Sequence, residues 1–180
     1  MSKRALCLLF KGFEEIETVT PIDLLRRAGV EVVVASLEQD DLVTGRSNIT
    51  LQADNKLSAI DVSDFDLLII PGGIGVKAVR LAGQATQLAR QFFQAEKFVS
   101  AICAAPLILL DAGLLDGRKY TAHFSTQAEL PQAVASKKVV IDDRLITSQG
   151  AGTAVEFGLA LVAQLLGESA SAQVAKAIMA

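Results

Sequence analysis

Short runs of mostly apolar residues recur along this chain, and helical segments separate most of them. The runs cover residues 5–9, 31–37, 67–70 and 98–102, of which 5–9 and 67–70 are unbroken, and segments of helical character lie at 14–29, 76–82 and 84–95. A strand without a polar face has to be buried on both sides, as in a parallel sheet that is covered by helices. We therefore expect an α/β fold with a mostly parallel central sheet and helices on both faces.

The remaining segments fit this architecture. Two hairpins are predicted, one pairing 42–44 with 49–51 and one pairing 139–141 with 145–147, and helices at 153–166 and 170–179 close the chain. Within the first helix Thr20 precedes Pro21 as a cap would, so we expect a break or kink there. Tyr120 is expected to lead a further short strand.

One cysteine lies at the point where a predicted strand gives way to a helix. Cys103 follows the apolar run 98–102 and precedes Pro106, which suits the first turn of a helix. The sulfur is therefore expected to face unpaired amides and the positive end of the helix, which favours the reactive thiolate. In parallel sheets the site lies beyond the carboxyl ends of the strands. Three turns are expected to meet at that edge, namely 11–17, 71–75 and 103–106.

Composition excludes several classes of function. The 17 basic and 20 acidic residues give a net charge of −3 without a basic block, so nucleic acid is not an expected partner. No apolar run approaches the ~20 residues of a membrane helix, and the apolar start is too short for an export signal. We expect one domain over residues 1–180 and a soluble, cytoplasmic protein. The two cysteines suggest no disulfide framework, and Cys7 is expected to be a buried small hydrophobe.

The glycine-rich turn has more than one interpretation. Residues 73–78 match a dinucleotide-binding pattern, and Glu96 follows about twenty positions later. That pattern usually occupies the first strand-to-helix turn, and here the turn comes late, which makes nucleotide binding the weaker reading. Alternatively the glycines only permit a tight turn, or the amides of Gly72 and Gly73 form an oxyanion pocket beside the thiol.

Histidine is equally informative because His123 is the only one. A site with two histidine ligands is therefore impossible within one chain, and no pair of cysteines has the spacing of a zinc site. No serine-hydrolase elbow of the form G-x-S-x-G occurs. His123 is either packed in a loop or carried toward the sheet edge where Cys103 lies.

Five stretches together resemble the ThiJ/PfpI superfamily, in the branch of the parkinsonism-associated protein deglycase, here called the DJ-one family. The stretches are 3–6 with 11–19, 23–30, 70–73, 101–106 and 145–153. The resemblance covers nearly the whole chain. It implies a single domain of the class I glutamine amidotransferase-like type, with a flavodoxin-like three-layer sandwich. The sequence departs from the family at Ala151, where proline is usual.

The resemblance also implies the roles of particular residues. Cys103 is the reactive thiol, Glu17 is the carboxyl that hydrogen-bonds it, and His123 stands beside it. The amides of Gly72, Gly73 and Ala104 line the site. In a homodimer, Arg27 and Arg46 approach the partner's pocket, where they would attract small anions. Glu14 and Glu15 are expected to be surface or structural acids.

Two functions follow from the resemblance. The first is a glyoxalase or protein deglycase that needs no metal or cofactor and acts on methylglyoxal or its protein adducts in carbonyl and oxidative stress. The second is a redox sensor or chaperone in which peroxide converts Cys103 to a sulfinate. Thiazole-phosphate biosynthesis and proteolysis, older labels of relatives, rank low because there is no phosphate loop and a lone histidine makes a poor triad.

Overall fold

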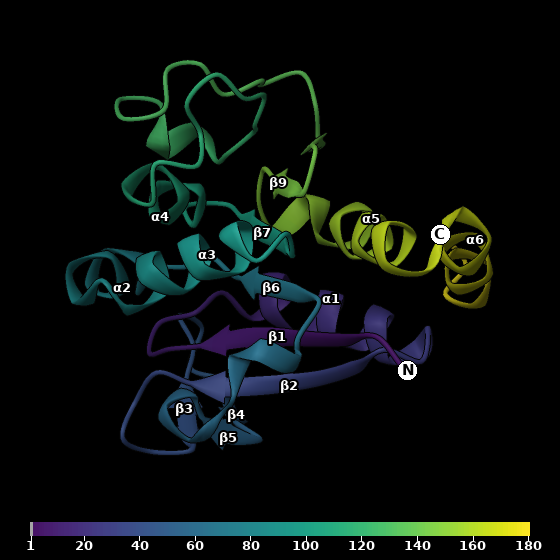
Figure 1. Cartoon of the computed structure of the whole chain (residues 1–180), viewed down its shortest axis with the longest axis horizontal. Coiled ribbons are helices and arrows are strands. Elements are labelled where there is room, and N and C mark those ends of the chain that lie inside the picture. Colours follow the sequence, from purple (N-terminus) through teal and green to yellow (C-terminus); the bar gives the residue numbers. More distant parts are fainter. Residues whose placement is uncertain (1) are drawn as a thin grey trace.

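A seven-stranded sheet forms the centre of the protein, in a computed structural model that describes residues 2–180 (Figure 1). The strand order is β5-β2-β1-β6-β7-β9-β8, and every neighbouring pair is parallel except β9 and β8. The strands are β1 (Arg4–Leu9), β2 (Glu31–Ser36), β5 (Asn55–Lys56), β6 (Leu67–Ile70), β7 (Phe98–Ile102), β8 (Val139–Asp142) and β9 (Leu145–Ser148). A separate antiparallel pair joins β3 (Leu42–Thr44) to β4 (Thr50–Gln52).

Helices cover both faces of the sheet and give the expected flavodoxin-like three-layer arrangement (Figure 1). One group packs α1 (Glu15–Arg27) against α5 (Ala154–Leu166), and α5 against α6 (Glu168–Ala177). The other group contains α2 (Val76–Ala82), α3 (Gln84–Gln94) and α4 (Pro106–Asp111). The predicted parallel sheet between two helical layers is therefore confirmed. No helix among residues 2–180 has the length and apolar character needed to cross a membrane.

The unbroken apolar runs form the centre of the core. In β1 the residues from Ala5 to Leu9 are fully buried, and so are all residues of β6. Cys7 pairs in register with Val34 on one side and Ile69 on the other, so both neighbours of β1 contribute apolar surface. Burying one such aliphatic side chain stabilises a fold by about 1.5–3 kcal/mol. The prediction that Cys7 is a buried small hydrophobe is confirmed.

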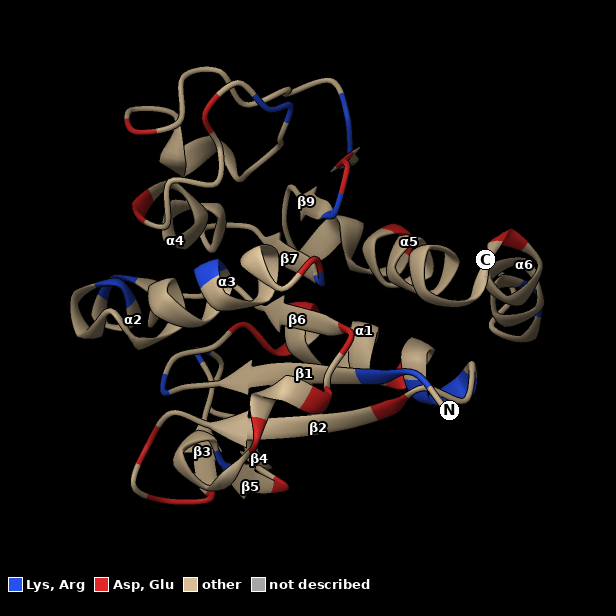
Figure 2. Cartoon of the chain, in the orientation of Figure 1, with Lys and Arg blue, Asp and Glu red and all other residues tan. Residues whose placement is uncertain are grey.

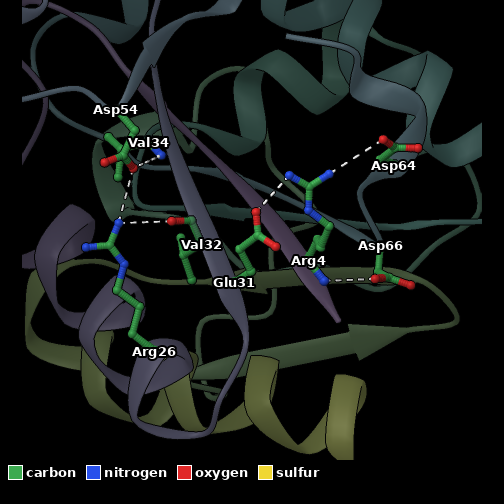
Figure 3. Close-up of polar contacts among 8 residues, drawn as sticks. All are labelled: Arg4, Arg26, Glu31, Val32, Val34, Asp54, Asp64 and Asp66. Carbon is green, nitrogen blue, oxygen red and sulfur yellow. Dashed lines mark hydrogen bonds and ion pairs between the residues drawn. The ribbon is translucent and has the colours of Figure 1, made fainter. Parts of the chain in front are cut away.

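Charged side chains concentrate on loops, on helices and at the amino ends of β1 and β2 (Figure 2). At those ends Arg4 donates from Nη2 to Glu31 Oε1 over 2.8 Å, and its backbone amide donates to Asp66 Oδ2 over 2.9 Å (Figure 3). Arg26 donates to Asp54 over 3.1 Å, and Asp54 accepts from the Val34 amide over 2.8 Å (Figure 3). Exposed ion pairs add little energy. The bonds to the backbone, however, hold β1 and β2 in place.

The prediction of a break at Pro21 is wrong, because α1 runs from Glu15 to Arg27 without interruption. A proline inside a helix removes one backbone hydrogen bond, here the one to the Glu17 carbonyl. Tight packing against α5 compensates for this loss. A Cβ atom added to Gly158 of α5 would lie 3.2 Å from the Cα atom of Pro21, so the two helices touch at the proline.

The expected strand led by Tyr120 is also absent, and residues 118–123 have no regular secondary structure. Backbone amides of this segment find side-chain oxygens in place of a neighbouring strand. The Lys119 amide donates to Asp142 over 2.8 Å, and the Thr121 amide donates to the Thr147 hydroxyl over 2.9 Å. These bonds run to single side chains, and therefore no ladder forms.

Candidate active site

The three turns at the carboxyl edge of the sheet come together as expected. The Glu14 amide donates to the Gly72 carbonyl over 3.0 Å, which joins the turn after β1 to the turn after β6. The Cys103 amide donates to the Ser148 carbonyl over 3.0 Å, and the His123 amide donates to the Cys103 carbonyl over 2.9 Å. The turn after β7 is thus tied to β9 and to the loop that carries His123.

Cys103 has an unusual backbone conformation at the centre of this arrangement. Its φ angle is 65°, in the left-handed region that side chains other than glycine rarely adopt. The residue follows β7 and reverses the chain before α4, so the strained conformation makes the sharp turn. Strain of this kind persists only where the surrounding structure enforces it, and it concentrates at functional sites. The thiol is half-buried and is not part of a disulfide.

Glu17 belongs to the first turn of α1, and its carboxyl lies between the turn 71–75 and the Cys103 thiol. The residue is only 1% exposed, and its Oε2 atom accepts from the Gly72 amide over 3.0 Å. The carboxyl also accepts from the Ala151 amide and forms a hydrogen bond with the Cys103 thiol. Burial raises the pKa of Glu17 to about 7, against the smaller lowering effects of these hydrogen bonds. Glu17 is therefore poised to hold or release a proton near neutral pH.

Burial, and next the charge of the Glu17 carboxylate, raise the pKa of the Cys103 thiol to about 12. The amides of Ala104 and Gly73 hydrogen-bond the sulfur and lower this pKa, but less strongly. The expectation that the turn favours a thiolate is thus wrong, because burial, and after it the charge of Glu17, outweighs the effect of the amides on the thiol pKa. Because the two groups are coupled, their titrations belong to the pair. A thiolate forms most readily when the carboxyl keeps the proton and donates it in a hydrogen bond to sulfur.

The predicted amides divide between two roles. Those of Gly73 and Ala104 point to the sulfur. The Gly72 amide is occupied by Glu17, so the expectation that it serves an oxyanion beside the thiol is corrected. A Cβ atom on Gly72 would lie 2.5 Å from Glu17 Oε2 and 2.6 Å from the Cβ atom of Cys103, which explains why glycine is needed.

The glycine-rich turn leaves no room for a nucleotide where the dinucleotide pattern would place its phosphates. A Cβ atom on Gly73 would lie 2.6 Å from the Glu14 amide nitrogen, and one on Gly75 would collide with the Lys11 carbonyl oxygen. The turn after β1 therefore fills the space above these glycines. Both glycines allow the turn after β6 to pack closely against the turn after β1. This agrees with the interpretation that the glycines permit a tight turn.

His123 borders the thiol without bonding to it. A Cβ atom added to Gly150 would lie 3.4 Å from the His123 Cδ2 atom, 3.7 Å from Glu17 Oε1 and 4.0 Å from Cys103 Sγ. These three side chains therefore surround Gly150, a residue that the sequence did not single out beyond its place in the 145–153 motif. The His123 Nδ1 atom pairs with the Ser125 hydroxyl over 2.8 Å.

Glu14 and Glu15 have structural roles, and both are buried. The Glu14 carboxylate caps α1 by accepting from the Glu17 amide over 2.7 Å. Glu15 accepts from the Ser47 amide over 2.7 Å and so fixes the turn between β3 and β4. The sequence did not reveal this hydrogen bond, because Glu15 and Ser47 are 32 positions apart in the chain.

The two arginines lie on exposed surface. Arg27 ends α1, and its Nε atom pairs with Asp23 over 2.8 Å. Arg46 stands in the turn of the β3–β4 hairpin, where its backbone amide donates to the Phe13 carbonyl over 2.8 Å. Neither pairs with Cys103 or Glu17 among the described residues. Their expected approach to a partner's pocket remains a prediction. Within residues 2–180 no three His, Cys, Asp or Glu side chains gather as metal ligands would.

Comparisons with known proteins identify the family of the chain. The model of the DJ-1/PfpI family matches residues 3–164. Protein dj-1beta of Drosophila melanogaster is 36% identical over 99% of this chain and 98% of its own length. A Bacillus subtilis protein named putative cysteine protease YraA is 36% identical over 83% of this chain and 90% of its own.

A solved structure titled Toxoplasma gondii DJ-1, oxidized, superimposes with a TM-score of 0.93. It is 31% identical and covers 99% of this chain and 98% of the other. The family match, the relatives and the fold agree with the motif around Cys103. The chain belongs to the DJ-1/PfpI family.

Proposed function

We propose that this protein is a cysteine-dependent glyoxalase or protein deglycase that needs no cofactor and acts on methylglyoxal or its protein adducts. The observation that carries the proposal is the hydrogen-bonded pair of Glu17 and Cys103. A carboxyl with a pKa of about 7 beside a half-buried thiol can exchange a proton with bound substrate at neutral pH.

The reaction begins when the Cys103 thiolate attacks the aldehyde carbon and forms a hemithioacetal. The aldehyde oxygen takes up a proton, for which Glu17 is the nearest donor. A base then removes the hydrogen from the former aldehyde carbon, and a proton returns to the neighbouring carbon. Glu17 is the nearest group for this transfer, and His123 borders the same space. The product is a lactoyl thioester, which water cleaves to lactate and free thiol, so one water is consumed for each lactate.

Lactate release tests this proposal with a defined set of variants. Wild type and Cys7→Ser should produce lactate from methylglyoxal, whereas Cys103→Ser should be inactive and Glu17→Gln should be strongly impaired. Cys7→Ser is the matched control because Cys7 is the second free cysteine of the described chain and is fully buried. Undiminished lactate output from Cys103→Ser would overturn the proposal.

A redox sensor or chaperone is the second candidate, and the hydrogen bonds around sulfur favour it. Two peroxide molecules would each transfer one oxygen to Cys103 and leave as water, which gives a sulfinate. The amides of Gly73 and Ala104 and a protonated Glu17 would then bond to the new oxygens. Mass spectrometry after mild peroxide should locate the gain of two oxygens on Cys103. Preferential oxidation of Cys7 would argue against sensing.

The function is proposed for a cytoplasmic homodimer with a role in carbonyl and oxidative stress. A free thiol suits a reducing compartment. The outer face of α1 exposes Ile16 and Val19, and the nearby hairpin exposes Ile49. Arg27 ends the same helix and Arg46 stands in the same hairpin, so a second copy that covers this apolar surface could bring both arginines to its partner's site. Light scattering should give twice the mass of one chain, and Val19→Asp should reduce it to that of one.

A further inference from the structure

Two apolar side chains that directly follow residues bonded to Cys103 are exposed to solvent. Ile74 is 72% exposed and Phe124 is 81% exposed. Large apolar side chains at the edge of a reactive group provide surface that a ligand can cover with a gain in free energy. Leu81, at 83%, is as exposed, but it lies at the far end of α2 and serves for comparison.

Ile74 is placed by the turn that contacts the sulfur. It follows Gly73, whose amide hydrogen-bonds Cys103. A Cβ atom on Gly12 would lie 3.0 Å from the Cγ1 atom of Ile74, so this side chain rests on the turn after β1. Gly12 has a φ angle of 77°, which glycine adopts without strain. Ile74 is therefore held at the edge of the site and keeps most of its surface open.

The position of Phe124 is set by the loop that carries His123. Phe124 follows His123, whose amide donates to the Cys103 carbonyl. The Phe124 ring stands against the imidazole, with 4.1 Å between ring centroids and a tilt of 36°. Both rings also line a cavity of about 90 Å³, whose walls include Leu130, Pro131 and Ala133. An apolar recess and an open aromatic ring thus adjoin the site.

We propose that Ile74 and Phe124 form an apolar rim that favours aldehydes with a bulky apolar or aromatic substituent over methylglyoxal. This inference rests on the proposed function and names its substrate class. The aldehyde carbon reaches sulfur while the substituent covers the Phe124 ring and the Ile74 side chain. Offset contact between aromatic rings adds to the gain from buried area. A methyl group is too small to use either contribution fully.

The ratio of kcat/KM for phenylglyoxal to kcat/KM for methylglyoxal tests this rim. Comparison of the same ratio between variants cancels the intrinsic reactivity of the two aldehydes. Phe124→Ala should lower the ratio about tenfold, and Ile74→Ala should lower it several-fold. Leu81→Ala should leave it at the wild-type value. Because all three side chains are exposed, the variants should fold normally, which their thermal unfolding checks.

Alkylation of Cys103 separates failure of the rim from failure of the proposed reaction. N-phenylmaleimide should modify Cys103 faster than N-ethylmaleimide, and Phe124→Ala should reduce this preference. If wild type makes no lactate but the alkylation preference falls in Phe124→Ala, the rim is supported and the reaction is refuted. Suppose instead that lactate production depends on Cys103, but Phe124→Ala and Ile74→Ala change neither the kcat/KM ratio of the two aldehydes nor the rate ratio of the two maleimides. The rim is then overturned and the reaction stands.

Discussion

The raised pKa of Glu17 should make the stability of the folded protein fall as the pH rises from 5 to 8. An acid whose pKa is higher in the folded than in the unfolded state binds its proton more tightly when folded. Its favourable contribution is complete below the unfolded pKa and is lost as the pH rises through the folded pKa. For Glu17 these values are 4.5 and about 7. The pH window from 5 to 8 spans most of this change.

The size of the effect follows from the two pKa values. Between pH 5 and pH 8 the linkage relation gives a loss of about 2.5 kcal/mol in the free energy of unfolding. Glu17 is almost completely buried, so water does not screen this contribution strongly. With the usual dependence of stability on urea, the midpoint of unfolding should fall by about 1–2 M.

Urea unfolding of wild type and Glu17→Gln at pH 5, 6, 7 and 8 measures this contribution. The midpoint of wild type should fall across the series, while that of Glu17→Gln should stay nearly constant. Glu15→Gln is the matched control, because Glu15 is a buried acid of the same helix: burial would raise its pKa, but hydrogen bonds from backbone amides, that of Ser47 first, outweigh burial and lower the pKa. Such an acid is ionised in both states above pH 5, so this variant should keep the wild-type slope. Parallel curves for wild type and Glu17→Gln would refute the assignment.

Three further predictions concern the turns around sulfur. Gly72→Ala should lower the free energy of unfolding by about 1–3 kcal/mol and slow alkylation of Cys103, because the added methyl would collide with Glu17 and Cys103. Gly152→Ala should do neither, since the space around Gly152 is open, and equal thermal unfolding of the two variants would contradict the steric reasoning. Cys103→Gly should be more stable than Cys103→Ala by about 1 kcal/mol, because only glycine adopts the φ angle of 65° without strain; the reverse order in urea unfolding would show that the turn is not strained. In native protein, iodoacetamide should label Cys103 alone, and Cys7 should react only in urea, because Cys7 is fully buried whereas Cys103 is half-buried; peptide mass mapping that finds Cys7 labelled without denaturant would contradict its burial.

Local sequence predicted those elements that are buried along all or nearly all of their length. The runs at 67–70 and 98–102 match β6 and β7 because both faces of each strand are covered, and no polar residue blurs their ends. β5 was missed because Asn55 and Lys56 are exposed and pair only with the edge of β2. The break at Pro21 was predicted wrongly because the contact with Gly158 cannot be seen in the local sequence.

The same distinction applies to the site. Cys103 was identifiable because its turn is encoded by adjacent residues, a buried strand before it and Pro106 after it. The partner of the Gly72 amide could not be identified from adjacent residues. Glu17 lies 55 positions away, and its carboxyl reaches this amide only because β1 packs beside β6. The proton balance of the pair depends on the burial of both groups, and burial is a property of the assembled fold.

The residues around sulfur come from segments that follow four different strands, with Glu17 after β1, Gly73 after β6, Cys103 after β7 and Gly150 after β9. No excised fragment of the chain could therefore reproduce the chemistry of this thiol. Loss of any one of these segments would open the site before the remaining strands separate. The rate at which a thiol reagent modifies Cys103, relative to a small free thiol, is thus a built-in gauge of how completely a population of molecules is folded.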